Sequence, residues 1–238
     1  MKNEEFLGRA KRQSRAATAI MESMKKMARR MWMLAGAAFF ILHSSFFISC
    51  SEEEAEVSEF ENWAARNAAF FATLDDSLSN RDYQWQRFLN YSLNPANVYD
   101  ADKYIYVKKI TEGDGGDSPC FTDSVRVIYQ GRLIPTATYP EGKVFDGTVY
   151  GKFDIATGYT VKQLVSSTVD GYATALQHMH RGDQWRVFIP SELAYGPNDN
   201  VSNGVITMYG GSVLIFDLIL VDFSPAGEEM PEWSSRQR

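Results

Sequence analysis

The sequence predicts an α+β fold in which an antiparallel β-sheet curls around one short α-helix, with a short helical segment before it. Beyond Asp102, several runs are rich in Val, Ile, Tyr and Phe and are separated by turn-forming residues, a pattern typical of β-strands. One stretch between these runs, after Asp170, has the character of a helix. Many strands with a single helix favour an antiparallel sheet packed around that helix.

Four runs are predicted to be strands: Tyr104–Ile110, Val125–Tyr129, Trp185–Ile189 and Val213–Phe223. The last is apolar on both faces, so we expect it at the centre of the sheet. Gly113–Pro119 (GDGGDSP) is a turn-rich break after the first strand. In the helical stretch, Asp170 is the expected N-cap of a helix from Gly171 to about Met179, which Gly182 should end.

The segment Val57–Leu78 carries apolar residues mostly three or four positions apart, with alanines between them, which predicts an amphipathic helix. Asn67 interrupts its apolar stripe. A second short helix is expected around Trp85–Leu89, ending before Asn94-Pro95. We interpret the segment as a spacer packed on the following domain. A dimerisation arm is the alternative; the oligomeric state stays open, with a monomer favoured.

The N-terminus has the organisation of a secretory signal. Four basic residues precede a mainly apolar run, Met31–Ile48, which ends in Ser49-Cys50. A cysteine directly after a small residue resembles a bacterial lipoprotein signal, which implies lipid attachment to Cys50 and an outer-membrane lipoprotein of the cell envelope. A transmembrane anchor is the alternative, since about 18 residues can just span a bilayer. Cleavage is favoured because the acidic tether Ser51–Glu54 follows at once.

Two further features of this region remain open. Residues 1–23 are polar and would lengthen the basic region of the signal, so Met24 is an alternative start. The acidic residues after Cys50 resemble the export tags of surface lipoproteins in Bacteroidetes-type bacteria. The face of the membrane, periplasmic or surface, is not fixed by this resemblance.

The charge of the chain is divided unequally. The formal net charge is −6, but residues 1–49 hold nine Lys and Arg against three Glu, leaving 15 basic and 27 acidic residues in 50–238, a net charge of −12. Such a body repels phosphate backbones, so no nucleic-acid partner is expected. The histidines are His43, His178 and His180, and their spacing fits no metal site. Cys120 is expected to be a half-buried loop residue rather than a reactive thiol, because no His or basic cluster lies beside it in sequence.

Five motifs occur in order along the second half of the chain: VRVIYQGRL (Val125–Leu133), GKVFDGT (Gly142–Thr148), VDGYATALQHM (Val169–Met179), WRVFIPSELAYG (Trp185–Gly196) and VLIFDLILVDF (Val213–Phe223). Together they resemble the FKBP-type peptidyl-prolyl cis-trans isomerases over roughly residues 101–223. The resemblance implies an enzyme without a cofactor that assists the folding of exported, proline-containing polypeptides. It divides the chain into a lipoprotein signal region (1–49), an acidic tether and helical segment (50–100), an FKBP-like isomerase domain (101–225) and a polar tail (226–238).

The resemblance also implies a site. Catalytic roles fall to Asp146, Tyr195, Phe145 and Tyr129. Substrate contacts fall to Phe153, Val169, Tyr172, Val205, Ile206 and Phe216, with Thr168 beside Val169. Rotation about a prolyl amide needs no nucleophile, and a dry aromatic cavity favours the twisted amide over the hydrated planar one. His178 and His180 are assigned instead to the end of the helix, where positive charge suits its dipole.

The chain departs from the family pattern in two respects. Tyr172 stands where typical active members have tryptophan, which keeps an aromatic floor but adds a hydroxyl that needs a partner. Gly147–Ser167 and Pro197–Gly211 are longer than in minimal members, and Pro135–Gly142 is an insertion. These departures motivate two alternatives: a binding module or chaperone with little isomerase activity, and a structural subunit of an outer-membrane assembly that docks through Val57–Leu78.

Overall fold

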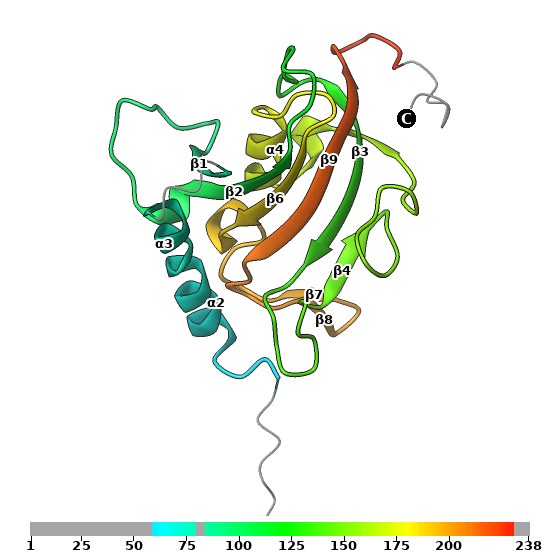
Figure 1. Cartoon of the computed structure of the whole chain (residues 1–238). Coiled ribbons are helices and arrows are strands. Elements are labelled where there is room, and N and C mark those ends of the chain that lie inside the picture. The colour runs from blue at the N-terminus through cyan, green and yellow to red at the C-terminus, as the bar shows by residue number, and fades with distance from the viewer. Residues whose placement is uncertain (1–58, 80–83, 231–238) are drawn as a thin grey trace, which may run out of the picture. The chain divides into compact units, whose positions relative to one another are not determined.

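A seven-stranded antiparallel sheet wraps around one helix, as the sequence predicts (Figure 1). The computed structural model describes residues 59–79 and 84–230, all within one compact unit. The strand order is β1-β2-β6-β9-β3-β4, and β5 pairs with the free part of β3. The strands of this sheet are β1 (Trp85–Leu89), β2 (Tyr104–Thr111), β3 (Ser124–Arg132), β4 (Val144–Gly147), β5 (Val161–Leu164), β6 (Gln184–Ile189) and β9 (Leu214–Ser224).

The remaining elements are short. The helices are α2 (Trp63–Ala72), α3 (Leu74–Ser79) and α4 (Asp170–Leu176), with 3-10 turns η1 (Ala101–Lys103), η2 (Val165–Ser167) and η3 (Ser191–Leu193). A separate hairpin is formed by β7 (Asn200–Ser202) and β8 (Val205–Met208). The sequence predicted four of the strands and missed β4, β5, β7 and β8, which are each only three or four residues long.

The apolar strand predicted at the centre of the sheet is β9, which pairs with β6 on one side and β3 on the other. Its residues from Leu214 to Leu220 are buried. On the concave face, helix α4 packs directly onto β2 and β6. A Cβ on Gly171 would lie 2.2 Å from Ile189 Cγ2, so only glycine permits this close approach of helix and sheet.

The expected ends of the helix are wrong in detail. Asp170 is its first helical residue, and Val169 occupies the N-cap position without a side-chain hydrogen bond. The helix ends at Leu176, well before Gly182. Gly182, at φ +87°, instead begins the turn into β6, and its N–H donates to the carbonyl of Leu220 at 2.8 Å.

The second predicted helix is also wrong, because Trp85–Leu89 forms the edge strand β1. In a strand, residues an odd number apart face opposite sides of the sheet. Trp85 accordingly stacks on Phe188 at a centroid distance of 5.5 Å, while Phe88 stacks on Trp185 at 5.6 Å. Strand β6, on the far side of β2, thus provides a ring partner on each face, and this tertiary pairing outweighs the local helical spacing.

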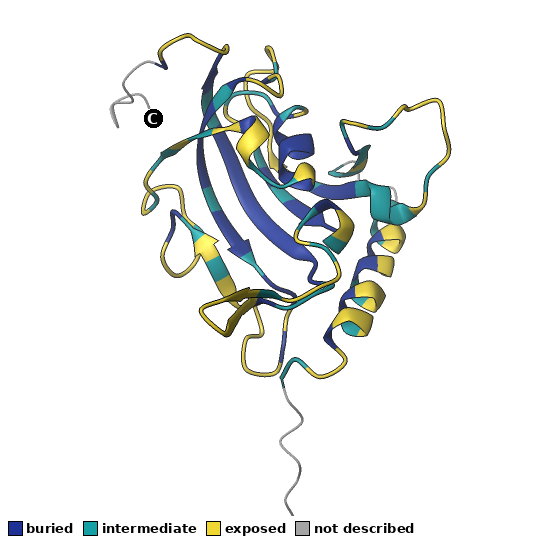
Figure 2. Cartoon of the chain, turned by 180° about the vertical axis from the view of Figure 1, so that it is seen from behind, coloured by how far each residue is buried: buried dark blue, intermediate teal, exposed yellow. Residues whose placement is uncertain are grey.

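Helices α2 and α3 cover part of the convex face of the sheet, and their outer side is exposed (Figure 2). Phe71 contacts Tyr106 edge-on at 5.0 Å, and the Tyr106 hydroxyl donates to Asp75 at 2.5 Å. Trp63, Phe71 and Leu74 are buried. The apolar face is therefore satisfied within the chain, as the spacer interpretation predicts, and these residues are not available as the docking face of the structural-subunit alternative.

Two polar side chains of α2 bind the segment that leads into β9; we call these contacts the α2 clasp. Asn67, which is fully buried, accepts a hydrogen bond from the Val213 N–H at 2.8 Å and donates to the Trp63 carbonyl at 2.8 Å. Trp63 Nε1 donates to Ser212 Oγ at 2.7 Å. The residue that interrupts the apolar stripe in sequence thus attaches the helix to the central strand.

Several sequence predictions fall at the ends of the chain. The signal region 1–49, Cys50 and the tether up to residue 58 lie outside the described residues. Of the expected tail, Met230 is buried, and its carbonyl accepts a hydrogen bond from Lys162 at 3.3 Å. Nowhere in residues 59–79 or 84–230 does a helix have the length and apolar character needed to cross a bilayer.

Cys120 is exposed rather than half-buried. Its neighbour Pro119 is buried, and the Cys120 N–H donates to the carboxylate of Asp123 at 2.8 Å. This turn fixes the backbone and leaves the side chain in solvent.

We predict that Asn67→Leu lowers the free energy of unfolding by about 1–3 kcal/mol, because the buried Val213 N–H loses its acceptor. Urea unfolding of the full chain measures the effect. Asn97→Ala is the control, since Asn97 is exposed and its side chain bonds only to the Tyr99 hydroxyl. Equal stability of Asn67→Leu and the unmodified chain would contradict the clasp.

Candidate active site

A cavity of about 250 Å³ opens on the concave face, between the sheet and the start of α4. Its position follows from strand register: Phe216 of β9 pairs with Gly131 of β3, and Gly131 pairs with Asp146 of β4. Paired residues of antiparallel strands share a face. The cavity is lined by Tyr129, Asp146, Gln163, Ser167, Thr168, Val169, Tyr172, Tyr195 and Phe216.

A β-bulge in β4 brings two adjacent side chains to this face. Gly131 pairs with Asp146 and Arg132 with Val144, so Phe145 is the extra residue of the bulge. Its ring packs edge-on against Phe216, with centroids 5.6 Å apart. A Cβ on Gly131 would lie 2.6 Å from Phe145 and 2.7 Å from Phe216, so the missing side chain at Gly131 makes room for both rings.

Aromatic rings form the walls and floor of the cavity. Tyr172 and Phe216 meet edge-on at 4.9 Å, and Tyr129 lies 6.1 Å from each of them. Tyr172 and Phe216 are buried, while Tyr129 is half-buried. Edge-to-face packing of this kind holds rings in fixed orientations, so the cavity has a preformed apolar surface.

One carboxylate faces this surface. Asp146 accepts a hydrogen bond from the Tyr129 hydroxyl at 2.8 Å and another from the Gly147 N–H at 2.8 Å. Burial, and then the bond to Asp146, raise the pKa of Tyr129 well above its usual value. Tyr129 therefore stays a neutral donor at physiological pH, and it fixes the orientation of the carboxylate.

Tyr195 lies at the mouth of the cavity, in the turn after η3. The turn is closed by the Gly196 N–H, which donates to the Ser191 carbonyl at 2.8 Å, and Gly196 has φ +81°. Partial burial, and then the charge of Asp146, raise the pKa of Tyr195. Its hydroxyl makes no hydrogen bond with any other residue in the described part of the chain. The protonated hydroxyl is thus free to donate to a ligand.

The floor tyrosine has a partner for its extra hydroxyl. Gln163 of β5 donates to the Tyr172 hydroxyl at 3.1 Å. Burial raises the pKa of Tyr172 well above its usual value, so this hydroxyl is neutral. Gln163 and Ser167 line the cavity and were missed from the sequence. The sequence indicates that the Tyr172 hydroxyl needs a hydrogen-bond partner. Only the pairing of β5 with β3 shows that this partner is Gln163.

The structure brings together seven of the predicted site residues: Tyr129, Phe145, Asp146, Val169, Tyr172, Tyr195 and Phe216. Three others lie elsewhere. Val205 and Ile206 are on the β7–β8 hairpin with exposed side chains. The hairpin adjoins Tyr195 at its base, where the Gly211 N–H donates to the Gly196 carbonyl at 3.0 Å.

Phe153 lies on the opposite, convex face, where it packs against Ile128, Val149 and Ile219. The reason is the buried side chain of Gln130, which faces that side. Its Nε2 donates to the carbonyls of Val149 at 2.9 Å and Gly151 at 3.0 Å. These bonds hold the loop that carries Phe153 behind the sheet, away from the cavity.

The described lining of the cavity contains no histidine or cysteine. A ring-walled hollow with one oriented carboxylate and one free phenol suits a protein that binds an apolar segment of peptide. This class agrees with the comparisons. Residues 116–221 match the family described as FKBP-type peptidyl-prolyl cis-trans isomerase.

Relatives match over part of their length. The chain is 33% identical over 124 residues to Macrophage infectivity potentiator of Trypanosoma cruzi, which is 52% of this chain and 55% of that protein. It is 38% identical over 89 residues to Outer membrane protein MIP of Legionella longbeachae, 37% of this chain and 33% of that protein. It thus spans about a third to a half of these curated relatives. The crystal structure of FkpA from Escherichia coli superimposes with a TM-score of 0.48 at 22% identity, over 78% of this chain and 72% of that chain.

We predict that the free energy of unfolding of Tyr172→Phe falls less at alkaline pH than that of the unmodified chain. Unfolded tyrosine ionises at about pH 10, whereas the folded protein holds the Tyr172 proton to a higher pH because its pKa is raised. Stability from this group is therefore complete below about pH 10 and falls as the pH rises. Denaturant unfolding at several pH values should give a shallower decline in the variant; Tyr150→Phe, at an 82% exposed residue, should match the unmodified chain. An identical decline in Tyr172→Phe would contradict this assignment.

Proposed function

We propose that this chain is a peptidyl-prolyl cis-trans isomerase that acts on proline-containing polypeptides. The observation that carries the proposal is the convergence of Tyr129, Asp146, Tyr172, Tyr195 and Phe216 on one cavity, within a region that matches the FKBP-type family. The prolyl ring would occupy the apolar hollow above Tyr172 and Phe216. The hydroxyl of Tyr195 would donate to a carbonyl of the bound peptide at the mouth.

The reaction needs only that the twisted amide be favoured over the planar one. The uncatalysed barrier is about 20 kcal/mol because rotation removes amide resonance. The planar amide is the more polar form and is better hydrated, so transfer into a dry, ring-walled cavity destabilises it relative to the twisted form. Asp146, held by Tyr129, would stabilise the charge that redistributes during rotation.

The test is a coupled assay of the full chain on a Xaa-Pro peptide. We expect the double variant Asp146→Ala/Tyr195→Ala to lose about tenfold or more in kcat/KM, which corresponds to about 1.4 kcal/mol of barrier. The matched control is Asp154→Ala/Tyr150→Ala, which removes the same two side-chain types from exposed positions outside the cavity lining. Turnover in the unmodified chain no higher than in the active-site double variant would remove the enzyme claim.

The cellular setting is proposed from the N-terminus. The basic and apolar run that ends in Ser49-Cys50 supports a lipoprotein attached to the outer membrane through Cys50, with exported proteins as clients. The name of the Legionella longbeachae relative, Outer membrane protein MIP, is consistent with this setting. A lipid anchor at Cys50 would hold the isomerase cavity at the membrane, where newly exported chains fold.

We predict that Cys50→Ala moves the chain from the membrane fraction to the soluble fraction of expressing cells, because lipid attachment is lost. Immunoblots of fractionated cells and the intact mass of the mature protein measure this. Cys120→Ala is the matched control, since Cys120 is the exposed thiol of the described domain. An unlipidated mature mass in the unmodified chain would contradict the anchor.

A holding activity is the second candidate, and one observation favours it. The β7–β8 hairpin beside Tyr195 exposes Val201, Val205 and Ile206, with exposed fractions of 59%, 65% and 39%. Exposed apolar groups next to a peptide cavity suit the capture of unfolded chains. Suppression of aggregation that survives Asp146→Ala/Tyr195→Ala but is lost on replacing these three residues by serine would support it, whereas joint loss of both activities would assign binding to the cavity alone.

A further inference from the structure

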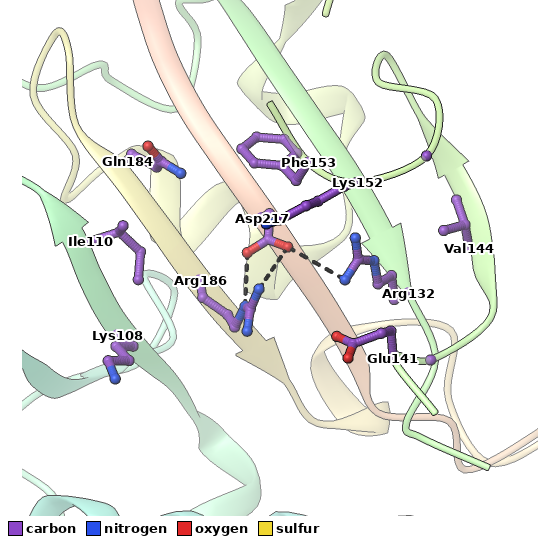
Figure 3. A pocket seen from close by; sticks show the side chains of 12 residues that line it. Lys108, Ile110, Arg132, Glu141, Val144, Lys152, Phe153, Gln184, Arg186 and Asp217 are labelled. Carbon is purple, nitrogen blue, oxygen red and sulfur yellow. Dashed lines mark hydrogen bonds and ion pairs between the residues drawn. The ribbon is translucent and has the colours of Figure 1, made fainter. Parts of the chain in front are cut away.

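A second cavity lies on the convex face of the sheet, opposite the candidate active site (Figure 3). Its volume of about 670 Å³ exceeds the roughly 250 Å³ of the first and is in the range of small-ligand sites, about 300–1,000 Å³. Asp217 belongs to this cavity, whereas its neighbour Phe216 belongs to the other. Successive residues of a strand face opposite sides, so the two cavities do not share their lining side chains.

Strand register aligns charged residues across the floor of this cavity. Lys108 of β2 pairs with Arg186 of β6, Arg186 pairs with Asp217 of β9, and Asp217 pairs with Gln130 of β3. Figure 3 shows Lys108, Arg186 and Asp217 on neighbouring strands. Like charges directly opposite each other, such as Lys108 and Arg186, destabilise a sheet. An anion bound over this row would relieve their repulsion.

The positive charge of the floor is only partly balanced. Asp217 is buried and binds Arg186 through two bonds, from Nε at 2.8 Å and from a terminal nitrogen at 3.0 Å. Arg132 reaches the same carboxylate only at 4.0 Å and spends two of its other donors on Gln130. Its side chain is 11% exposed. One buried carboxylate therefore serves two guanidinium groups, and the charge of Arg132, which is largely buried, is balanced less fully than that of the more exposed Arg186.

The lining of the cavity as a whole also carries more positive than negative charge. Four cations (Lys108, Arg132, Lys152 and Arg186) and two anions (Glu141 and Asp217) line the cavity, a net charge of +2. The described residues as a whole hold 12 Lys and Arg against 21 Asp and Glu. A third of the cations thus gather in one cavity of an acidic domain. The positive charge of the cavity is therefore opposite in sign to the net charge of the domain around it.

We propose that this cavity binds a phosphate monoester, free or as the headgroup of a lipid. A phosphate monoester carries close to two negative charges at neutral pH, which matches the net charge of the lining. Arg132 and Lys152 both line the cavity, and both residue types are suited to bind phosphate oxygens. Ile110, Val144 and Phe153 supply apolar walls for the organic group. The site is independent of the proposed isomerase activity.

The test is a calorimetric titration of the full chain with glycerol 3-phosphate and inorganic phosphate, and with acetate for comparison. Lys108→Gln/Lys152→Gln should weaken binding about tenfold, the effect of losing a charge-assisted hydrogen bond. Lys109→Gln is the matched control. Lys109 is the next residue on the same strand and faces the other side of the sheet. Both lysines lie over a tryptophan ring, Lys109 at 5.4 Å from Trp185 and Lys108 at 5.9 Å from Trp85.

Thermal melts and the peptide assay verify that both lysine variants remain folded and active. Absence of phosphate binding, binding of acetate as tight as that of phosphate, or equal weakening by Lys109→Gln would each overturn the proposal. Vesicle binding by the unlipidated Cys50→Ala chain distinguishes a lipid headgroup from a soluble phosphate monoester as the ligand. Lys108-dependent binding to vesicles that contain phosphatidic acid, but not to phosphatidylcholine vesicles, indicates a lipid headgroup. Binding of glycerol 3-phosphate without vesicle binding indicates a soluble ester.

Discussion

The pairing of β9 with both β6 and β3 is the interaction on which the rest of the structure depends. It places Phe216 in the concave cavity and Asp217 in the convex one, because alternate residues of a strand face opposite sides. Both neighbours are also needed: β3 contributes Tyr129 to one face and Arg132 to the other, and β6 contributes Arg186. A slip of one residue in this register would exchange the two faces and destroy both sites.

Local deviations from regular structure adapt this frame to the site. The β4 bulge turns Phe145 and Asp146 to one side of the strand, which an unbroken strand could not do. The absence of a side chain at Gly131 admits the two rings that Phe145 and Phe216 contribute. The hydroxyl of Tyr129 then fixes the carboxylate of Asp146. An apolar enclosure and an oriented charge are thus produced by the same short stretch of β3 and β4.

Most of the fold could be predicted from the sequence because the long strands and the central helix bury strongly patterned residues. The errors occur where non-local contacts decide. Trp85–Leu89 has helical spacing, yet each face of the segment finds a ring partner beside β2. Phe153 resembles a wall residue, yet Gln130 holds its loop behind the sheet. Gln163 enters the site only because β5 pairs with the free part of β3, and a four-residue strand leaves little signal.

The α2 clasp shows that the packed domain extends beyond the region that matches the family model. The family match begins at residue 116, but Trp63 and Asn67 hold the backbone that enters β9, and Phe71 and Phe70 cover Tyr106 and Phe188. A fragment cut at the start of the matched region would lose β1 and β2 and expose an aromatic patch on the remaining sheet. A fragment that keeps these contacts therefore has to include α2, which lies outside the matched region.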